Sequence, residues 1–142
     1  MKRVLGIVFM LSILCACISS PSGSGAGPDD VLGNWARGLE GRDLDLLMSA
    51  YWPDAEMVIK NPDGPENVFN GIDEIRQQQQ TTVIDNPESK ISVWLELDEE
   101  KINSVTVIRT LTVQVEDFRV INIMTMEKRG RDWKIIQQTI EF

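Results

Sequence analysis

Residues 105–116 read VTVIRTLTVQVE, and this stretch decides the fold. Its apolar residues fall on every second position, which is the period of a β-strand with one buried face. The same period begins upstream in ISVWLEL (91–97) and returns in VINIMTME (120–127) and WKIIQQTIEF (133–142). The segments DEEKINS and KRGRD separate these stretches, and Gly130 in the second is typical of a hairpin loop. The sequence therefore predicts an antiparallel meander of four long strands.

Upstream of the meander, apolar residues recur at helical spacing. A first helix is expected after Asp29 and Asp30, with Gly41 as its stop, and a second runs from Asp43 to Pro53. A third helix is expected in GIDEIRQQQQTTVID (71–85). Between the second and third helices, AEMVIK favours a short strand and NPDGPENVFNG a turn-rich loop. The fold class is α+β, with three helices available to cover one face of the sheet.

This order of elements resembles the nuclear transport factor two-like superfamily, which includes SnoaL-like cyclases and ketosteroid isomerases. GRDLDLLMSAYWPDAEMVI resembles the family's passage from a short helix into its first strand, NGIDEIRQ its helix start, and RDWKIIQQTIEF its closing strand. The resemblance implies a curved antiparallel sheet wrapped around three N-terminal helices, a cone of cystatin-like topology with an apolar pocket at its open end. Because this fold hosts isomerases, cyclases, dehydratases and members without known chemistry, fold alone does not settle function.

The resemblance also implies where catalytic groups would lie. Members that move protons beside a carbonyl carry Asp or His where the first strand meets its turn, and here Asn61 takes that position. An amide cannot act as a general base, and the chain contains no histidine. An enzyme would need another base, namely Asp54, Asp63 or Glu141, and Tyr51 would be its hydrogen-bond donor. An acid buried near Tyr51 would favour catalysis, whereas a cone without a carboxylate would favour binding.

Arg109 shares its strand parity with apolar neighbours, so its guanidinium is expected on the apolar face. A buried, unpaired arginine would be very costly. Three outcomes stay open at this point: Arg109 pairs with Glu96 or another acid, a bulge turns it outward, or it receives an anionic group of a ligand.

We interpret the domain as a non-enzymatic module that holds a small, partly apolar or anionic ligand, or a partner segment, in the cone. The residues expected to line this pocket are Trp52, Asn61, Gln79, Arg109, Gln137 and Thr139. No cofactor is expected, and no metal, because zinc would need more ligands than two cysteines and no histidine supply. Trp94 alternates with the apolar residues of its strand, so it is expected on the opposite face. There it would anchor a homodimer through the sheet or be a partly covered surface tryptophan.

The N-terminal segment has the layout of an export signal. Lys2 and Arg3 precede an apolar run that is shorter than the roughly 20 residues of a membrane-spanning helix. The stretch LCAC (14–17) resembles the lipobox of bacterial lipoproteins, which implies cleavage before Cys17 and a lipid on its thiol. The alternative is an ordinary signal peptide with two bystander cysteines.

The predicted organisation is a signal peptide at 1–16, a lipidated tether rich in Ser, Gly and Pro at 17–28, and a folded domain at 29–142. Because Ile18 is not the Asp that retains enterobacterial lipoproteins in the inner membrane, the resemblance implies the periplasmic face of the outer membrane. A purely structural envelope lipoprotein with a collapsed pocket is a third possibility.

The chain is acidic, with 14 basic against 22 acidic residues, and cleavage would also remove Lys2 and Arg3. An acidic surface repels phosphate backbones and anionic headgroups. Nucleic acid is therefore not an expected partner, and membrane contact is expected through the lipid on Cys17.

Overall fold

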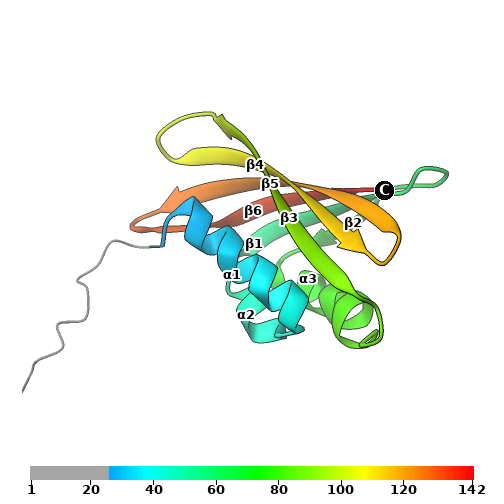
Figure 1. Cartoon of the computed structure of the whole chain (residues 1–142). Coiled ribbons are helices and arrows are strands. Elements are labelled where there is room, and N and C mark those ends of the chain that lie inside the picture. Colours follow the sequence, from blue (N-terminus) through cyan, green and yellow to red (C-terminus); the bar gives the residue numbers. More distant parts are fainter. Residues whose placement is uncertain (1–25) are drawn as a thin grey trace, which may run out of the picture.

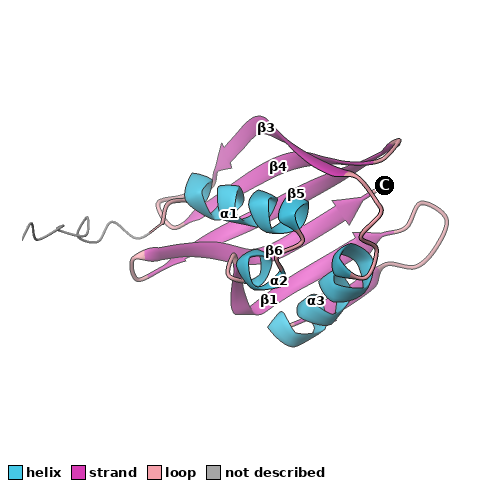
Figure 2. Ribbon diagram, turned by 60° about the horizontal axis from the view of Figure 1, so that its bottom comes forward, coloured by secondary structure: helices cyan, strands magenta, loops and turns pink. Residues whose placement is uncertain are grey.

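The computed structural model describes residues 26–142, except for the side chains of residues 95–101. Three helices lie on one face of a six-stranded sheet with the order β2-β1-β6-β5-β4-β3 (Figures 1 and 2). Strands β1 and β6 run parallel, and all other neighbours run antiparallel. The predicted α+β class and the closing four-stranded meander are confirmed. Cys17 and the predicted signal peptide lie outside the described residues.

The first two helices begin at short-range hydrogen bonds. Helix α1 (Pro28–Gly41) starts with a proline, and Asp30 accepts a hydrogen bond from the Gly27 N–H at 3.0 Å. Helix α2 (Leu44–Met48) is capped by Asp43, as predicted, because this carboxylate accepts from the Leu46 N–H at 3.0 Å. No helix among the described residues is long and apolar enough to cross a membrane.

The third predicted helix is present, but its second half is wider than an α-helix. Helix α3 (Ile72–Gln79) continues directly into the π-helical turn η1 (Gln80–Ile84). Such turns are rare and often lie beside functional sites. Here η1 borders the cavity described below.

The strands are β1 (Tyr51–Lys60), β2 (Asn67–Asn70), β3 (Ile91–Lys101), β4 (Thr106–Val115), β5 (Phe118–Arg129) and β6 (Asp132–Glu141). The expectation that the second helix reaches Pro53 is wrong, because α2 ends at Met48 and Tyr51 already belongs to β1. Pairing with β6 accounts for this: the Ile135 N–H donates to the Ala50 carbonyl at 2.8 Å. The segment expected to be only a turn also contains β2, which adds an edge strand to β1.

An extra residue in β6 decides which of its side chains face the helices. The register between β5 and β6 shifts so that Ile136 is a bulge. The bulge resets the alternation, and Ile135 and Gln138 are both fully buried while Gln137 is exposed. Gln137 and Thr139 were expected to line the pocket. This expectation is corrected, because the bulge directs both side chains to the outer face.

A candidate ligand cavity

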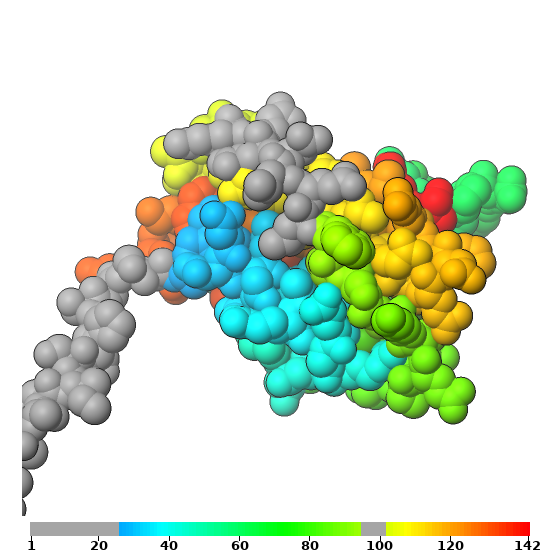
Figure 3. All heavy atoms as spheres, in the orientation of Figure 1, coloured from blue at the N-terminus to red at the C-terminus, as the bar shows by residue number. Residues whose placement is uncertain are grey.

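A cavity of about 200 Å³ opens between the helices and the inner face of the sheet. It lies where α3 and η1 meet the ends of β1, β4 and β6 and the start of β3. Apolar side chains from both layers form most of its wall, among them Leu39, Ile59, Val113 and Ile140. In the space-filling view, α1 and α2 (blue to cyan) lie beside the segment around η1 (green to yellow-green) (Figure 3). A cavity of about 150 Å³ is enough for a benzene ring, so this one accommodates a small molecule.

The polar side chains of the wall carry no charge. Its side chains are amides and hydroxyls: Gln78, Gln79, Thr82, Asn86, Ser89, Asn122 and Gln138. Within the described part of the chain, no Asp, Glu, Lys or Arg side chain lines the cavity. A charged ligand would therefore lose its water without gaining an opposite charge.

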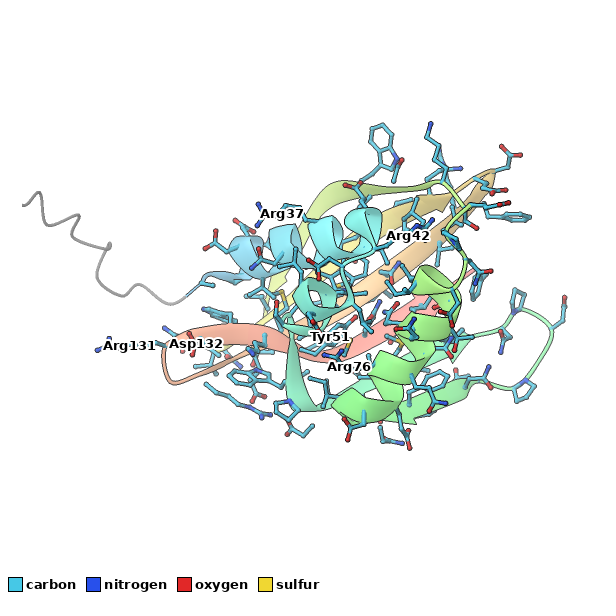
Figure 4. All side chains as sticks on the ribbon, turned by 90° about the horizontal axis from the view of Figure 1, so that it is seen from below. Arg37, Arg42, Tyr51, Arg76, Arg131 and Asp132 are labelled. Carbon is cyan, nitrogen blue, oxygen red and sulfur yellow. The ribbon has the colours of Figure 1, made fainter. Side chains whose placement is uncertain are left out.

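A buried hydrogen-bond chain, formed by Trp35, Tyr51, Gln138 and Asn122, crosses the floor of the cavity. The Trp35 indole N–H donates to the Tyr51 oxygen at 2.8 Å. The Tyr51 hydroxyl donates to the Gln138 side-chain carbonyl, and the Gln138 amide nitrogen donates to Asn122 Oδ1 at 2.7 Å. Three of these four residues line the cavity, and Tyr51 lies directly behind them, between the sheet and the helices (Figure 4).

The phenol of Tyr51 stays protonated in this environment. Burial raises its pKa well above the usual value, although hydrogen bonds from Trp35 and Gln79 oppose that shift. Because the phenol has a single proton, it donates to Gln138 and accepts from Trp35. Its one proton is therefore committed inside the protein.

Arg42 ties together two segments at the mouth of the cavity. It follows α1 in the left-handed backbone region, with φ 55°. Its guanidinium donates from Nη1 to the Val83 carbonyl and from Nη2 to the Ser89 carbonyl (Arg42 is labelled in Figure 4). Val83 and Ser89 both line the cavity, so one planar cation connects η1 with the segment that enters β3.

Of the six predicted pocket residues, Gln79 lines the cavity and the other five lie elsewhere. Trp52 is on the outer side of β1, where its indole N–H donates to the Glu127 carbonyl at 2.9 Å. Its ring contacts the cations of Arg129 and Lys134, at 5.0 and 5.4 Å from the centroid.

Asn61 lies in the turn after β1 and donates to the Pro65 carbonyl at 2.8 Å. Gln137 donates to Glu56 at 2.9 Å on the outer face, and Thr139 follows it on that face. Asn61 points away from the helices because it lies in the turn, and Gln137 and Thr139 do so because the bulge in β6 precedes them.

Arg109 faces the helices, as its parity predicted, and is only 8% exposed. Its guanidinium pairs with Asp29 in the first turn of α1 at 2.9 Å. The acid is thus supplied by a helix, while the side chain of Glu96 lies outside the described residues. Arg109 does not line the cavity, which is formed at the other end of β4 by Val113 and Val115.

The three acids named as alternative bases of an enzyme also lie outside the cavity. Asp54 forms two hydrogen bonds with Arg129, at 2.7 and 3.0 Å, and these lower the pKa of its carboxyl group. Glu141 pairs with Lys60 at 2.8 Å, and Asp63 lies in an exposed turn. The arrangement around Tyr51 is an indole and amides rather than an acid.

Asn122 and Gln138 are among the site residues that the sequence analysis missed. Asn122 occupies the parity of Val120 and Met124 in VINIMTME, so a polar residue on an apolar stripe was a readable signal, as it was at Arg109. Gln138 gave no such signal, because the bulge at Ile136 puts it on the inner face only in three dimensions.

No protein-family model matches the sequence, and no curated protein matches it at a significant level. Solved structures do match. An NTF2-like protein of unknown function from Shewanella oneidensis MR-1 superposes with a TM-score of 0.65 at 14% identity, over 80% of this chain and 95% of that one. The hexachlorocyclohexane dehydrochlorinase LinA-type3 from Novosphingobium barchaimii LL02 gives 0.62 at 15% identity, over 79% and 81%. A putative calcium/calmodulin-dependent protein kinase type II association domain from Thiobacillus denitrificans gives 0.65 at 13% identity, over 84% and 97%.

These similarities define the fold and nothing finer. The described domain has the NTF2-like fold, as the resemblance of its sequence segments implied. The neighbours include an enzyme, an association domain and proteins of unknown function, so the site itself must carry the argument about function.

Proposed function

We propose that this domain is a binding module that holds a small, uncharged, mainly apolar molecule in the cavity. The observation that carries the proposal is a cavity of about 200 Å³ whose wall combines aliphatic side chains with neutral amides and hydroxyls. Arg109, the residue expected to receive an anion, pairs with Asp29 away from this wall. The proposal therefore narrows the expected ligand from partly apolar or anionic to neutral.

The alternative that the domain is an enzyme has weaker support, because the candidate catalytic acids do not line the cavity. Asp54 and Glu141 are engaged with surface cations, and Tyr51 gives its proton to an amide. The dehydrochlorinases among the structural neighbours share the fold at 15 to 17% identity, and this similarity does not assign their activity to this domain.

The proposal is tested with matched small probes. Ligand-observed NMR should show toluene, which is neutral, binding to the purified domain, and benzoate, its charged counterpart, failing to bind. Ile140→Trp fills the cavity and should abolish toluene binding, whereas Thr139→Val, the neighbour on the outer face, should leave it intact. Mass spectrometry of the native protein should also recover a neutral molecule that co-purifies. Absence of toluene binding, or equal binding of benzoate, contradicts the proposal.

We also propose that a lipid on Cys17 holds the domain at the cell envelope, at the periplasmic face of the outer membrane. The support is the lipobox resemblance of LCAC and the tether-like composition that follows it. In Figure 1, α1 begins at the end of the domain opposite the chain end marked C, near which the cavity opens. A tether joined to α1 would thus leave the mouth of the cavity pointing away from its attachment.

Cell fractionation tests the anchor. Cys17→Ser should release the protein from the membrane fraction, and Cys15→Ser, two residues away, should leave it there. Membrane association that survives Cys17→Ser rules out lipidation at this residue, without any bearing on the cavity.

A further inference from the structure

We infer that the cavity selects ligands that carry a hydrogen-bond acceptor, such as a carbonyl oxygen, on an apolar body, and that the side-chain NH₂ of Asn122 donates to this acceptor. The inference rests on the proposed function and specifies the ligand class for the same site.

The direction of the buried hydrogen-bond chain is fixed at one end. The Trp35 indole can only donate, so the Tyr51 oxygen must accept from it at 2.8 Å. The single proton of Tyr51 then goes to the Gln138 carbonyl oxygen. This leaves the Gln138 amide nitrogen to donate to Asn122 at 2.7 Å.

The chain therefore ends with a donor. Asn122 Oδ1 accepts from Gln138, so the opposite end of the same amide is its NH₂ group. This group forms no hydrogen bond with any described residue, and Asn122 lines the cavity from the inner face of β5 with only 3% of its surface exposed. A donor facing a mainly apolar cavity gains free energy from an acceptor placed there, because an unmade hydrogen bond is costly in such surroundings.

The neighbouring groups do not offer the ligand a competing donor from the floor. Tyr51 has committed its proton to Gln138 and accepts from Trp35. Gln79 reaches the cavity from the helical wall, opposite the sheet that carries Asn122.

The apolar walls define the rest of the ligand. Met57, Val113 and Val120 face the cavity from three strands beside Asn122, and Ile140 is its direct partner across β5 and β6. A ketone with a compact hydrocarbon body fits both the aliphatic wall and the single donor at its floor.

The test compares acetophenone with α-methylstyrene, which has the same shape but a CH₂ group in place of the carbonyl oxygen. Acetophenone should bind the domain about tenfold more tightly, which is the effect of one neutral hydrogen bond. Asn122→Leu should remove this difference while α-methylstyrene still binds. Thr82→Val changes the helical wall of the same cavity, but the Thr82 hydroxyl already donates to the Gln78 carbonyl, so the tenfold preference should persist.

The outcomes separate this inference from the proposed function. Equal binding of the two probes by the wild-type domain overturns the inference and leaves the neutral binding site standing, whereas binding of neither contradicts the site itself. If Asn122→Leu does not fold, an NMR measurement on the wild-type domain still tests the inference. Acetophenone must shift the Asn122 side-chain NH₂ signals in a ¹⁵N-correlated NMR spectrum, and α-methylstyrene must not shift them comparably. Matching shifts from both probes overturn the inference.

Discussion

Tyr51 is the single tyrosine of the chain, and it lies in the middle of the buried hydrogen-bond chain. Burial raises the pKa of its phenol above the value of about 10 that an unfolded chain shows. Its contribution to stability is therefore fully present below about pH 10 and is lost as the pH rises toward the folded pKa, since the unfolded state releases the proton first. Tyrosinate absorbance should appear only together with alkaline unfolding, followed by circular dichroism of the same sample.

Tyr51→Phe tests the same residue at neutral pH. The variant leaves the Trp35 N–H and the Gln138 carbonyl oxygen without their buried partner, at a cost of about 2 to 4 kcal/mol in the free energy of unfolding. Urea unfolding measures the loss, and the stability of the variant should fall less steeply above about pH 10 than that of the wild type. Unchanged stability at neutral pH would show that the hydrogen-bond chain is not formed.

At the scale of elements, Gly38 is where α1 and α2 come closest. A Cβ atom at this position would lie 2.5 Å from the Leu47 backbone nitrogen, and backbone cannot move aside as a flexible side chain can. Gly38→Ala should therefore destabilise the domain by about 1 to 3 kcal/mol, the usual cost of overpacking.

Gly33→Ala is the matched control, in the same helix. A Cβ atom there meets nothing within 4 Å, so the better helix propensity of alanine should raise stability by up to about 1 kcal/mol. Thermal unfolding of the two variants should give shifts of opposite sign. Two shifts of the same sign would contradict the close approach of the helices.

The mouth of the cavity gives an element-scale prediction about binding. Arg42→Lys keeps the charge but loses the planar fork that reaches the Val83 and Ser89 carbonyls together. Amide hydrogen exchange in residues 85–90 should become faster, and toluene should bind several-fold more weakly. Arg37→Lys, on the exposed side of α1, where the guanidinium bonds only Asn34 among the described residues, should change neither measurement.

The elements that could be predicted from the sequence were those with regular patterns. Strand β4 keeps an unbroken period of two, so the inward position of Arg109 followed from its neighbours. Strand β6 has the same apparent period, but Ile136 is a bulge that no Gly or Pro announces, and so Gln138 rather than Gln137 reaches the cavity. Tyr51 continued the helical stripe of α2, and pairing with the distant β6 drew it into a strand. Both errors arise from contacts between strands, which a local pattern does not contain.

At the scale of the whole molecule, the two faces of the sheet have different chemistry. The inner face holds the cavity, and the outer face has a groove near the β4–β5 turn, with a wall formed in part by Trp94, Thr112, Gln114 and Arg119. Trp94 is 64% exposed and pairs with Thr112 on β4, which in turn pairs with Ile121 on β5. Ile121 is also exposed. An exposed tryptophan beside a second apolar side chain is a typical centre of a protein interface.

We propose that this outer face binds a second copy of the chain around a twofold axis, where each patch meets itself. Because the chain has a net charge of -8, two copies repel each other over most of their surface. The groove differs because it carries both signs of charge, Lys90 and Arg119 beside Glu116 among the described residues, so that unlike charges of the two copies can face each other across the axis. Sedimentation equilibrium should thus show a dimer, and Trp94→Ala should weaken it by about thirtyfold, the effect of losing an interface anchor.

Phe118→Ala is the control for the dimer, because Phe118, the first residue of β5, is still more exposed, at 72%, but does not line the groove. It should leave the dimer intact. Neither variant should change toluene binding, because Trp94 and the cavity are on opposite faces of the sheet. A wild-type domain that stays monomeric at high micromolar concentration contradicts the dimer. A dimer that Phe118→Ala disrupts as strongly as Trp94→Ala would place the contact elsewhere on the molecule.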